Sequence, residues 1–175
     1  MIRTKPTSLL LAVVALALVA LVVAGCGGDD NGTASASPNP SGATVGVSDI
    51  DGLGKVLVDS QGRTVYLFEK DTGPASTCSG ACAIDWPPVT ANGKPTTGDG
   101  VTASMVSTSK RSDGQAQVIY DGHPLYRFDG DSEPGDATGQ NVDAFGAKWF
   151  VLSPDGEKVT GAAKSSGGGG SAYPY

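Results

Sequence analysis

The sequence has little of the chemistry that hydrolases and metal enzymes use. It contains one histidine, His123, in 175 residues. It has no G-x-S-x-G, no H-E-x-x-H and no phosphate-binding glycine loop. A dinuclear copper centre of the oxidase type needs a second histidine, so it is excluded. We therefore expect no catalytic set, no cofactor and no resident metal.

The sequence also has few positively charged residues and no apolar run long enough to span a membrane. Twelve Lys and Arg stand against 18 Asp and Glu, and the formal net charge is −6. An acidic surface argues against nucleic acid and against binding anionic headgroups by charge. The one long apolar run, Leu9 to Ala24, is shorter than the roughly 20 residues that a membrane-spanning helix needs.

The amino terminus has the signals of an exported protein. Arg3 and Lys5 precede the apolar run, which ends in "LVVAGC". This order is typical of a secretory signal peptide, here residues 1–25. Cys26 directly follows small residues, as in a bacterial lipobox, and we predict its lipidation. The expected partner is a membrane, reached through the lipid anchor on the extracytoplasmic face. An uncleaved anchor helix is the alternative.

Composition divides the remaining chain into three parts. Residues 26–44 are the predicted lipidated cysteine and a Gly-, Ser-, Asn- and Pro-rich stretch that cannot bury enough surface to fold, so it is expected to be a flexible tether. Residues 161–175 form a Gly-rich tail, expected to be disordered. Residues 45–160 remain as one domain, long enough for a single modest core.

The domain is rich in strand and turn signals. Strand-type runs flank Ser60–Gly62 and Asp121-Gly122, of which the second is the strongest short hairpin signal. Asp113-Gly114 is a similar, weaker signal. The best helix candidate is Ser79 to Asp85, followed at once by prolines that would stop a helix. We predict a mainly β fold of antiparallel hairpins with short helical insertions.

One motif occurs twice in this domain. "VYLFEKD" at 65–71 and "LYRFDGD" at 125–131 share Tyr-x-Phe-x-x-Asp. Each copy is the second arm of a predicted hairpin, and each is followed by a tryptophan. Internal repetition explains this order, with repeats at about 53–98 and 113–156. The repeated residues are Tyr66, Phe68, Asp71 and Trp86 in the first copy, and Tyr126, Phe128, Asp131 and Trp149 in the second.

A lipobox, a low-complexity tether and tandem Tyr-x-Phe-x-x-Asp units together resemble the predicted bacterial lipoproteins that carry a secreted repeat of unknown function. The resemblance covers residues 53 to about 156. It implies an envelope location and a two-repeat architecture, and it implies no mechanism. The expected role is a non-enzymatic binding or structural module, with an unidentified protein or small-molecule ligand.

The motif residues are expected to build the core. Along a strand the tyrosine and phenylalanine of each copy point to one face, and their neighbours point to the other. We expect these aromatic rings to pack inward, with Trp86 and Trp149 closing matching ends of a shared core and each tyrosine hydroxyl bonded at the edge. Asp71 and Asp131 are expected to form an Asx-turn or a cap. An exposed aromatic platform for glycans or quinones is the alternative.

The cysteines left after Cys26 form an even pair. Cys78 and Cys82, in an exported chain, indicate a structural disulfide. Residues four apart on a helical turn have Cα atoms about 6 Å apart, within disulfide range. Redox exchange, or a copper site with Met105 and His123, is the alternative function.

An acidic run also raises calcium binding. Asp129, Asp131 and Glu133 alternate like the start of an EF-hand loop. Pro134 stands where that loop needs glycine, and no helices flank the run, so calcium is not predicted.

Overall fold

A computed structural model describes residues 44–163 of the chain. The predicted signal peptide, the lipidation site Cys26, most of the tether and residues 164–175 of the tail lie outside this range. Within it the chain is mainly β, and every strand pairing in the sheets is antiparallel, which confirms the predicted fold class.

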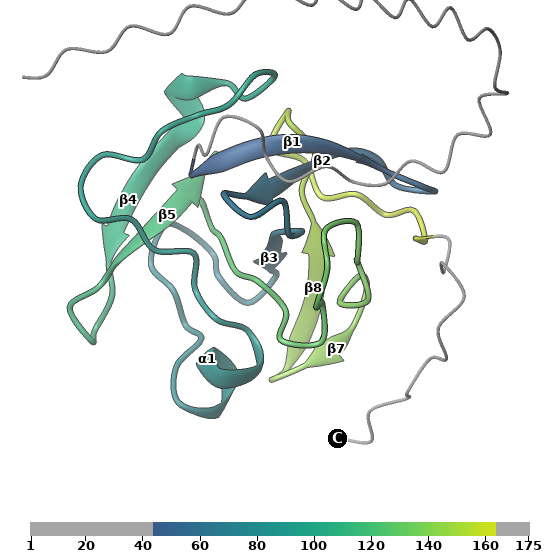
Figure 1. Ribbon diagram of the computed structural model, residues 1–175. Helices are drawn as coiled ribbons and strands as arrows, with labels where there is room; N and C mark the ends of the chain where they lie inside the picture. Colours follow the sequence, from purple (N-terminus) through teal and green to yellow (C-terminus); the bar gives the residue numbers. More distant parts are fainter. Residues whose placement is uncertain (1–43, 164–175) are drawn as a thin grey trace, which may run out of the picture. The chain divides into compact units, whose positions relative to one another are not determined.

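Eight short strands make three sheets in residues 44–163 (Figure 1). The first sheet is a hairpin of β1 (Val45–Ile50) and β2 (Gly54–Asp59). The second has the order β3-β8-β7, from β3 (Tyr66–Phe68), β8 (Ala147–Val151) and β7 (Asp143–Ala144). The third has the order β4-β5-β6, from β4 (Val106–Lys110), β5 (Ala116–Tyr120) and β6 (His123–Pro124). The helical pieces are α1 (Ala81–Asp85) and the 3₁₀ turn η1 (Ala103–Met105).

The predicted turns are where the chain reverses. Asp113-Gly114 joins β4 to β5, and Asp121-Gly122 joins β5 to β6. Asp121 has φ 45° and Gly122 has φ 83°, the left-handed values that a two-residue hairpin turn requires. Helix α1 falls inside the predicted Ser79–Asp85 segment. Strand β1 was not predicted, because "VGVSDI" has no regular alternation of apolar and polar residues.

The two motif strands lie side by side and run in opposite directions. The backbone N–H of Tyr66 donates to the carbonyl of Tyr126 at 2.8 Å, and that of Tyr126 donates back to Tyr66 at 3.0 Å. These reciprocal hydrogen bonds relate the backbone around Tyr66 to the backbone around Tyr126 by a local twofold axis. Each tyrosine therefore both donates a backbone hydrogen bond to the other repeat and accepts one from it.

The core has two clusters, one on each face of the motif strands. Tyr66 and Phe68 belong to one cluster, which also contains the motif aromatics of the second repeat. Val65 and Leu67 belong to the other cluster, with the apolar side chains of β5. The predicted alternation is confirmed, and both faces of the motif are buried.

Candidate functional site

Four aromatic side chains of the motif form one buried column. The Phe68 ring stacks on Trp149 with centroids 4.0 Å apart, and Trp149 stacks on Trp86 at 3.9 Å. Trp86 packs in turn on Phe128 at 4.4 Å. Each phenylalanine thus lies on the tryptophan of the other repeat.

The expectation that Trp86 and Trp149 close matching ends of a shared core is wrong. The two indoles lie together in the middle of the column, and the phenylalanines form its ends. The reason is the antiparallel pairing of Tyr66 with Tyr126. It directs the residues that follow each tyrosine toward the other repeat, where each phenylalanine meets the other repeat's tryptophan.

The tyrosine rings complete this core symmetrically. Tyr66 lies edge-on to Trp86 at 5.4 Å, and Tyr126 lies edge-on to Trp149 at 5.1 Å. A Cβ at Gly139 would lie 2.8 Å from Trp86 Cη2 and 3.0 Å from Tyr66 Cζ. Any other residue at position 139 would place its Cβ too close to both rings, so this position requires glycine.

The motif tyrosines and aspartates bond across the repeats. The Tyr66 hydroxyl donates to Asp131 Oδ2, and the Tyr126 hydroxyl donates to Asp71 Oδ2, both at 2.5 Å. All four residues are buried. Each copy of the motif therefore supplies the donor for one pair and the acceptor for the other.

Each aspartate also organises the loop that follows it. Asp71 Oδ1 accepts the backbone N–H and the hydroxyl of Thr77 at 2.7 and 2.6 Å. Asp131 Oδ1 accepts the same two groups of Thr138 at 2.9 and 2.6 Å. Of the two expected roles, an Asx-turn or a cap, these bonds do not form the first, because they reach six and seven residues on and an Asx-turn reaches two.

Burial raises the pKa of both tyrosines and of Asp131. Desolvation, followed by the charge of Asp131, raises the pKa of Tyr66 well above its ordinary value. Desolvation also raises the pKa of Tyr126 and that of Asp131, although the bonds from Thr138 and Tyr66 lower the Asp131 pKa. The phenols stay protonated and donate, so they are neither nucleophiles nor bases at neutral pH.

Cys78 and Cys82 form a disulfide, with Cα atoms 5.3 Å apart. They are only 1% and 6% exposed and belong to the motif cluster. The guanidinium of Arg111 fixes the loop before them, donating to Cys78 O at 2.7 Å and to Ser76 Oγ at 2.8 Å. Nothing in the sequence around Arg111 indicated this role. Buried sulfurs favour a structural disulfide over thiol exchange.

The structure does not gather the candidate metal ligands. Met105 packs against the second core cluster, whereas the cysteines belong to the first. The Asp131 carboxylate accepts bonds from Tyr66 and Thr138, and so does not face a calcium loop. Across residues 44–163 no three His, Cys, Asp or Glu side chains are placed to hold a metal ion.

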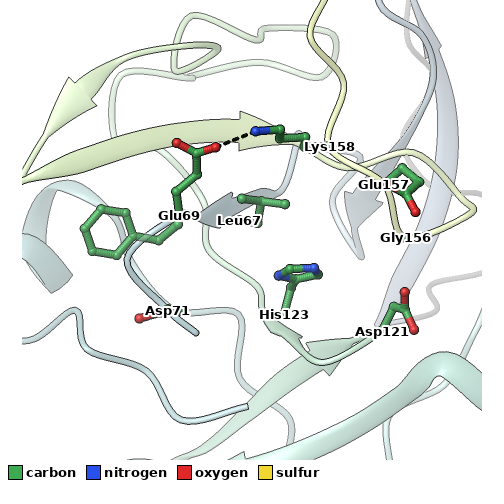
Figure 2. Close-up of a pocket in the computed structure, with 9 residues that line it drawn as sticks. Leu67, Glu69, Asp71, Asp121, His123, Gly156, Glu157 and Lys158 are labelled. Carbon is green, nitrogen blue, oxygen red and sulfur yellow. Dashed lines mark hydrogen bonds and ion pairs between the residues drawn. The ribbon is translucent and has the colours of Figure 1, made fainter. Parts of the chain in front are cut away.

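An open pocket of about 520 Å³ lies beside β3 and β6 (Figure 2). The His123 ring stands between Leu67 and Asp121, and on another wall Lys158 Nζ donates to Glu69 Oε1 at 2.6 Å. The side chains of Asp121 and His123 form no hydrogen bond with any other residue in the described range. The lining residues are Leu67, Phe68, Glu69, Asp71, Asp121, His123, Gly156, Glu157 and Lys158.

Two segments of the chain, residues 48–90 and 107–153, match the family described as a secreted repeat of unknown function. Together they make up about half of the 175 residues. The chain belongs to this family. Each segment of this secreted-repeat protein contains one motif copy with its tryptophan, so the two repeats and the family resemblance predicted from the sequence are confirmed.

No curated protein and no solved structure matches the secreted-repeat protein significantly. The family description is consistent with a location outside the cytoplasm. Among residues 44–163 there is no helix whose length and apolar character would let it cross a membrane.

Proposed function

We propose that this secreted-repeat protein is a lipid-anchored, non-enzymatic binding module on the extracytoplasmic side of a bacterial membrane. The observation that carries the proposal is a difference between the polar side chains of the repeated motif and two polar side chains of the pocket. The polar atoms of the motif bond to one another inside the core, whereas Asp121 and His123 face an open pocket with no partner in residues 44–163.

The motif is a clamp that holds the two repeats together. Tyr66 and Tyr126 have no exposed surface, and their hydroxyls are engaged by carboxylates of the opposite repeat. A substrate cannot reach these groups without breaking the aromatic column. The clamp makes a rigid frame, and the pocket is formed where strand β3, the turn before β6 and the loop after β8 meet on that frame.

The anchor is supported by the sequence before the domain. Cys26 follows "LVVAG" at the end of a signal-like apolar run, and the stretch up to residue 44 has the composition of a flexible tether. A lipid on Cys26 would keep the pocket near the membrane. More than one acyl chain is needed for stable anchoring.

Replacing the anchor residue should abolish lipidation. In a bacterial host fed a labelled fatty acid, we expect the full-length wild type to incorporate label and Cys26→Ala to incorporate none. Cys78→Ala, which leaves the lipobox intact, is the matched control and should be labelled like the wild type. Equal labelling of wild type and Cys26→Ala would show that the anchor is elsewhere or absent.

Binding should be confined to the pocket. We expect a set of small fragments of differing charge, titrated into the ¹⁵N-labelled mature protein in detergent micelles, to shift the amide signals of Asp121, Gly122, His123 and Gly156. The signals of Trp86 and Trp149 should not move, because these buried residues do not line the pocket. His123→Ala should weaken the shifts, and Ile84→Ala, on the exposed face of α1, should not. Fragments that shift the signals of α1 or of the two tryptophans instead would contradict the proposal.

A further inference from the structure

The pocket has a counterpart on the other side of the local twofold relation, and that counterpart is filled. Counting from the paired tyrosines, Arg63 stands three residues before Tyr66 as His123 stands before Tyr126. Arg127 directly follows Tyr126 as Leu67 follows Tyr66. His123 and Leu67, which line the pocket, thus correspond to Arg63 and Arg127 in the other half.

Those arginines gather on a buried carboxylate. Asp59 Oδ2 accepts from Arg63 Nη2 at 3.1 Å and lies 3.5 Å from Arg127 Nη1. The other oxygen, Oδ1, accepts the backbone N–H groups of Gln61 and Arg63 at 2.8 and 3.0 Å. Desolvation, followed by the charge of Arg63, lowers the pKa of Arg127. In this half, guanidinium groups supplied by the chain itself neutralise the carboxylate beside the hairpin turn.

The pocket is lined by carboxylates, Asp121 among them, and by no arginine. Asp121 stands five residues before Tyr126 and Asp59 seven before Tyr66, so the two carboxylates are similar in setting and not counterparts by position. Asp121 is in the turn between β5 and β6, and its backbone N–H donates to Met105 O at 3.0 Å. The turn before β6 is packed closely by Gly156, where a Cβ would lie 2.7 Å from Asp121 Oδ2. Lys158 is already paired with Glu69 at 2.6 Å, so it does not neutralise Asp121.

We propose that the pocket binds a guanidinium group on a short apolar stem, such as an arginine side chain of a peptide, much as Asp59 in the other half is paired with the chain's own Arg63 and Arg127. The guanidinium pairs with Asp121 and stacks on the His123 ring, as planar guanidinium groups do on aromatic faces. The stem lies beside Leu67, which lines the pocket with the 3% of its surface that is exposed. The inference rests on the proposed binding function and names the chemical class of its ligand.

The test compares two probes that differ in charge and share a shape. N-acetylarginine amide and N-acetylcitrulline amide are titrated into the mature protein in micelles at low salt, followed by amide shifts of Asp121, His123 and Gly156. We expect the arginine compound to bind at least about tenfold more tightly, because citrulline keeps the planar donor group and lacks the positive charge.

Two variants assign that difference to the pocket. Asp121→Asn keeps the side-chain shape and tolerates the left-handed backbone, and should cost at least about tenfold in affinity for the arginine compound. Asp143→Asn makes the same charge change on exposed β7 and should leave affinity unchanged. His123→Ala, outside the turn, is the second variant if Asp121→Asn alters the amide spectrum, and it should also weaken binding.

The possible outcomes distinguish failure of the guanidinium site from failure of the proposed binding function. Equal affinity for the two probes, or full affinity in Asp121→Asn and His123→Ala, overturns the guanidinium site and leaves binding at the pocket standing. If neither probe nor any fragment of the earlier set shifts the pocket signals, the proposed binding function itself is wrong.

Discussion

Phe68→Ala and Phe128→Ala are each expected to lower the free energy of unfolding by about 3–5 kcal/mol, the usual cost of truncating a buried phenylalanine. Phe68 is 1% exposed and Phe128 is 7% exposed, and each ends the aromatic column on a tryptophan of the other repeat. Each truncation therefore removes buried contact area and uncovers an indole face. Urea unfolding of residues 27–175 measures the loss.

The two truncations should cost similar amounts, because the two rings have equivalent partners. Ile84→Ala is the control: Ile84 is 71% exposed, so its loss should stay within about 0.5 kcal/mol. A loss below about 1 kcal/mol for either phenylalanine would contradict its place in the core. That result would favour the alternative in which the motif aromatics form a surface platform.

Local signals predicted much of this fold. Asp-Gly turns reverse the chain at 113–114 and 121–122, where Gly114, Asp121 and Gly122 take the left-handed backbone that glycine and aspartate adopt cheaply. Alternation along 65–68 predicted two faces, and both faces are buried. The repeat was visible because the same contacts must be made twice, which keeps the same residue types at the same spacing.

The partners across the repeats could not be predicted from the sequence. Spacing within one motif suggests that Tyr66 and Asp71 act together, yet Tyr66 bonds Asp131. That choice depends on the backbone pairing of Tyr66 with Tyr126, a contact between residues 60 positions apart, which no local pattern encodes. The same pairing brings the tryptophans to the middle of the column.

The pocket was missed for a different reason. His123 looked like an ordinary loop histidine after a turn, and Asp121 like a turn residue. The meaning of His123 comes from comparison with its counterpart Arg63, which pairs with Asp59 in the other repeat. The twofold relation that permits this comparison is visible only once the strands are paired.

A double-mutant cycle tests the crossed clamp directly. Tyr66→Phe should cost about 1–3 kcal/mol of unfolding free energy, because it leaves a buried oxygen of Asp131 without its donor. Asp131→Asn should cost a similar amount, since it weakens the bond to the same hydroxyl. The double variant should cost less than the sum, with a coupling energy of about 0.5–3 kcal/mol, as groups in one hydrogen bond show.

The informative control is the pair within a single repeat. Tyr66→Phe with Asp71→Asn removes groups that share no bond, because Asp71 accepts from Tyr126 and Thr77. Their costs should therefore add to within about 0.5 kcal/mol. Urea unfolding at neutral pH measures both cycles on the same chain. Coupling of Tyr66 to Asp71 that equals or exceeds its coupling to Asp131 would mean that each motif closes on itself. The aspartate would then be a local device of its own repeat, and the two repeats would be joined by the aromatic column and the backbone pairing alone.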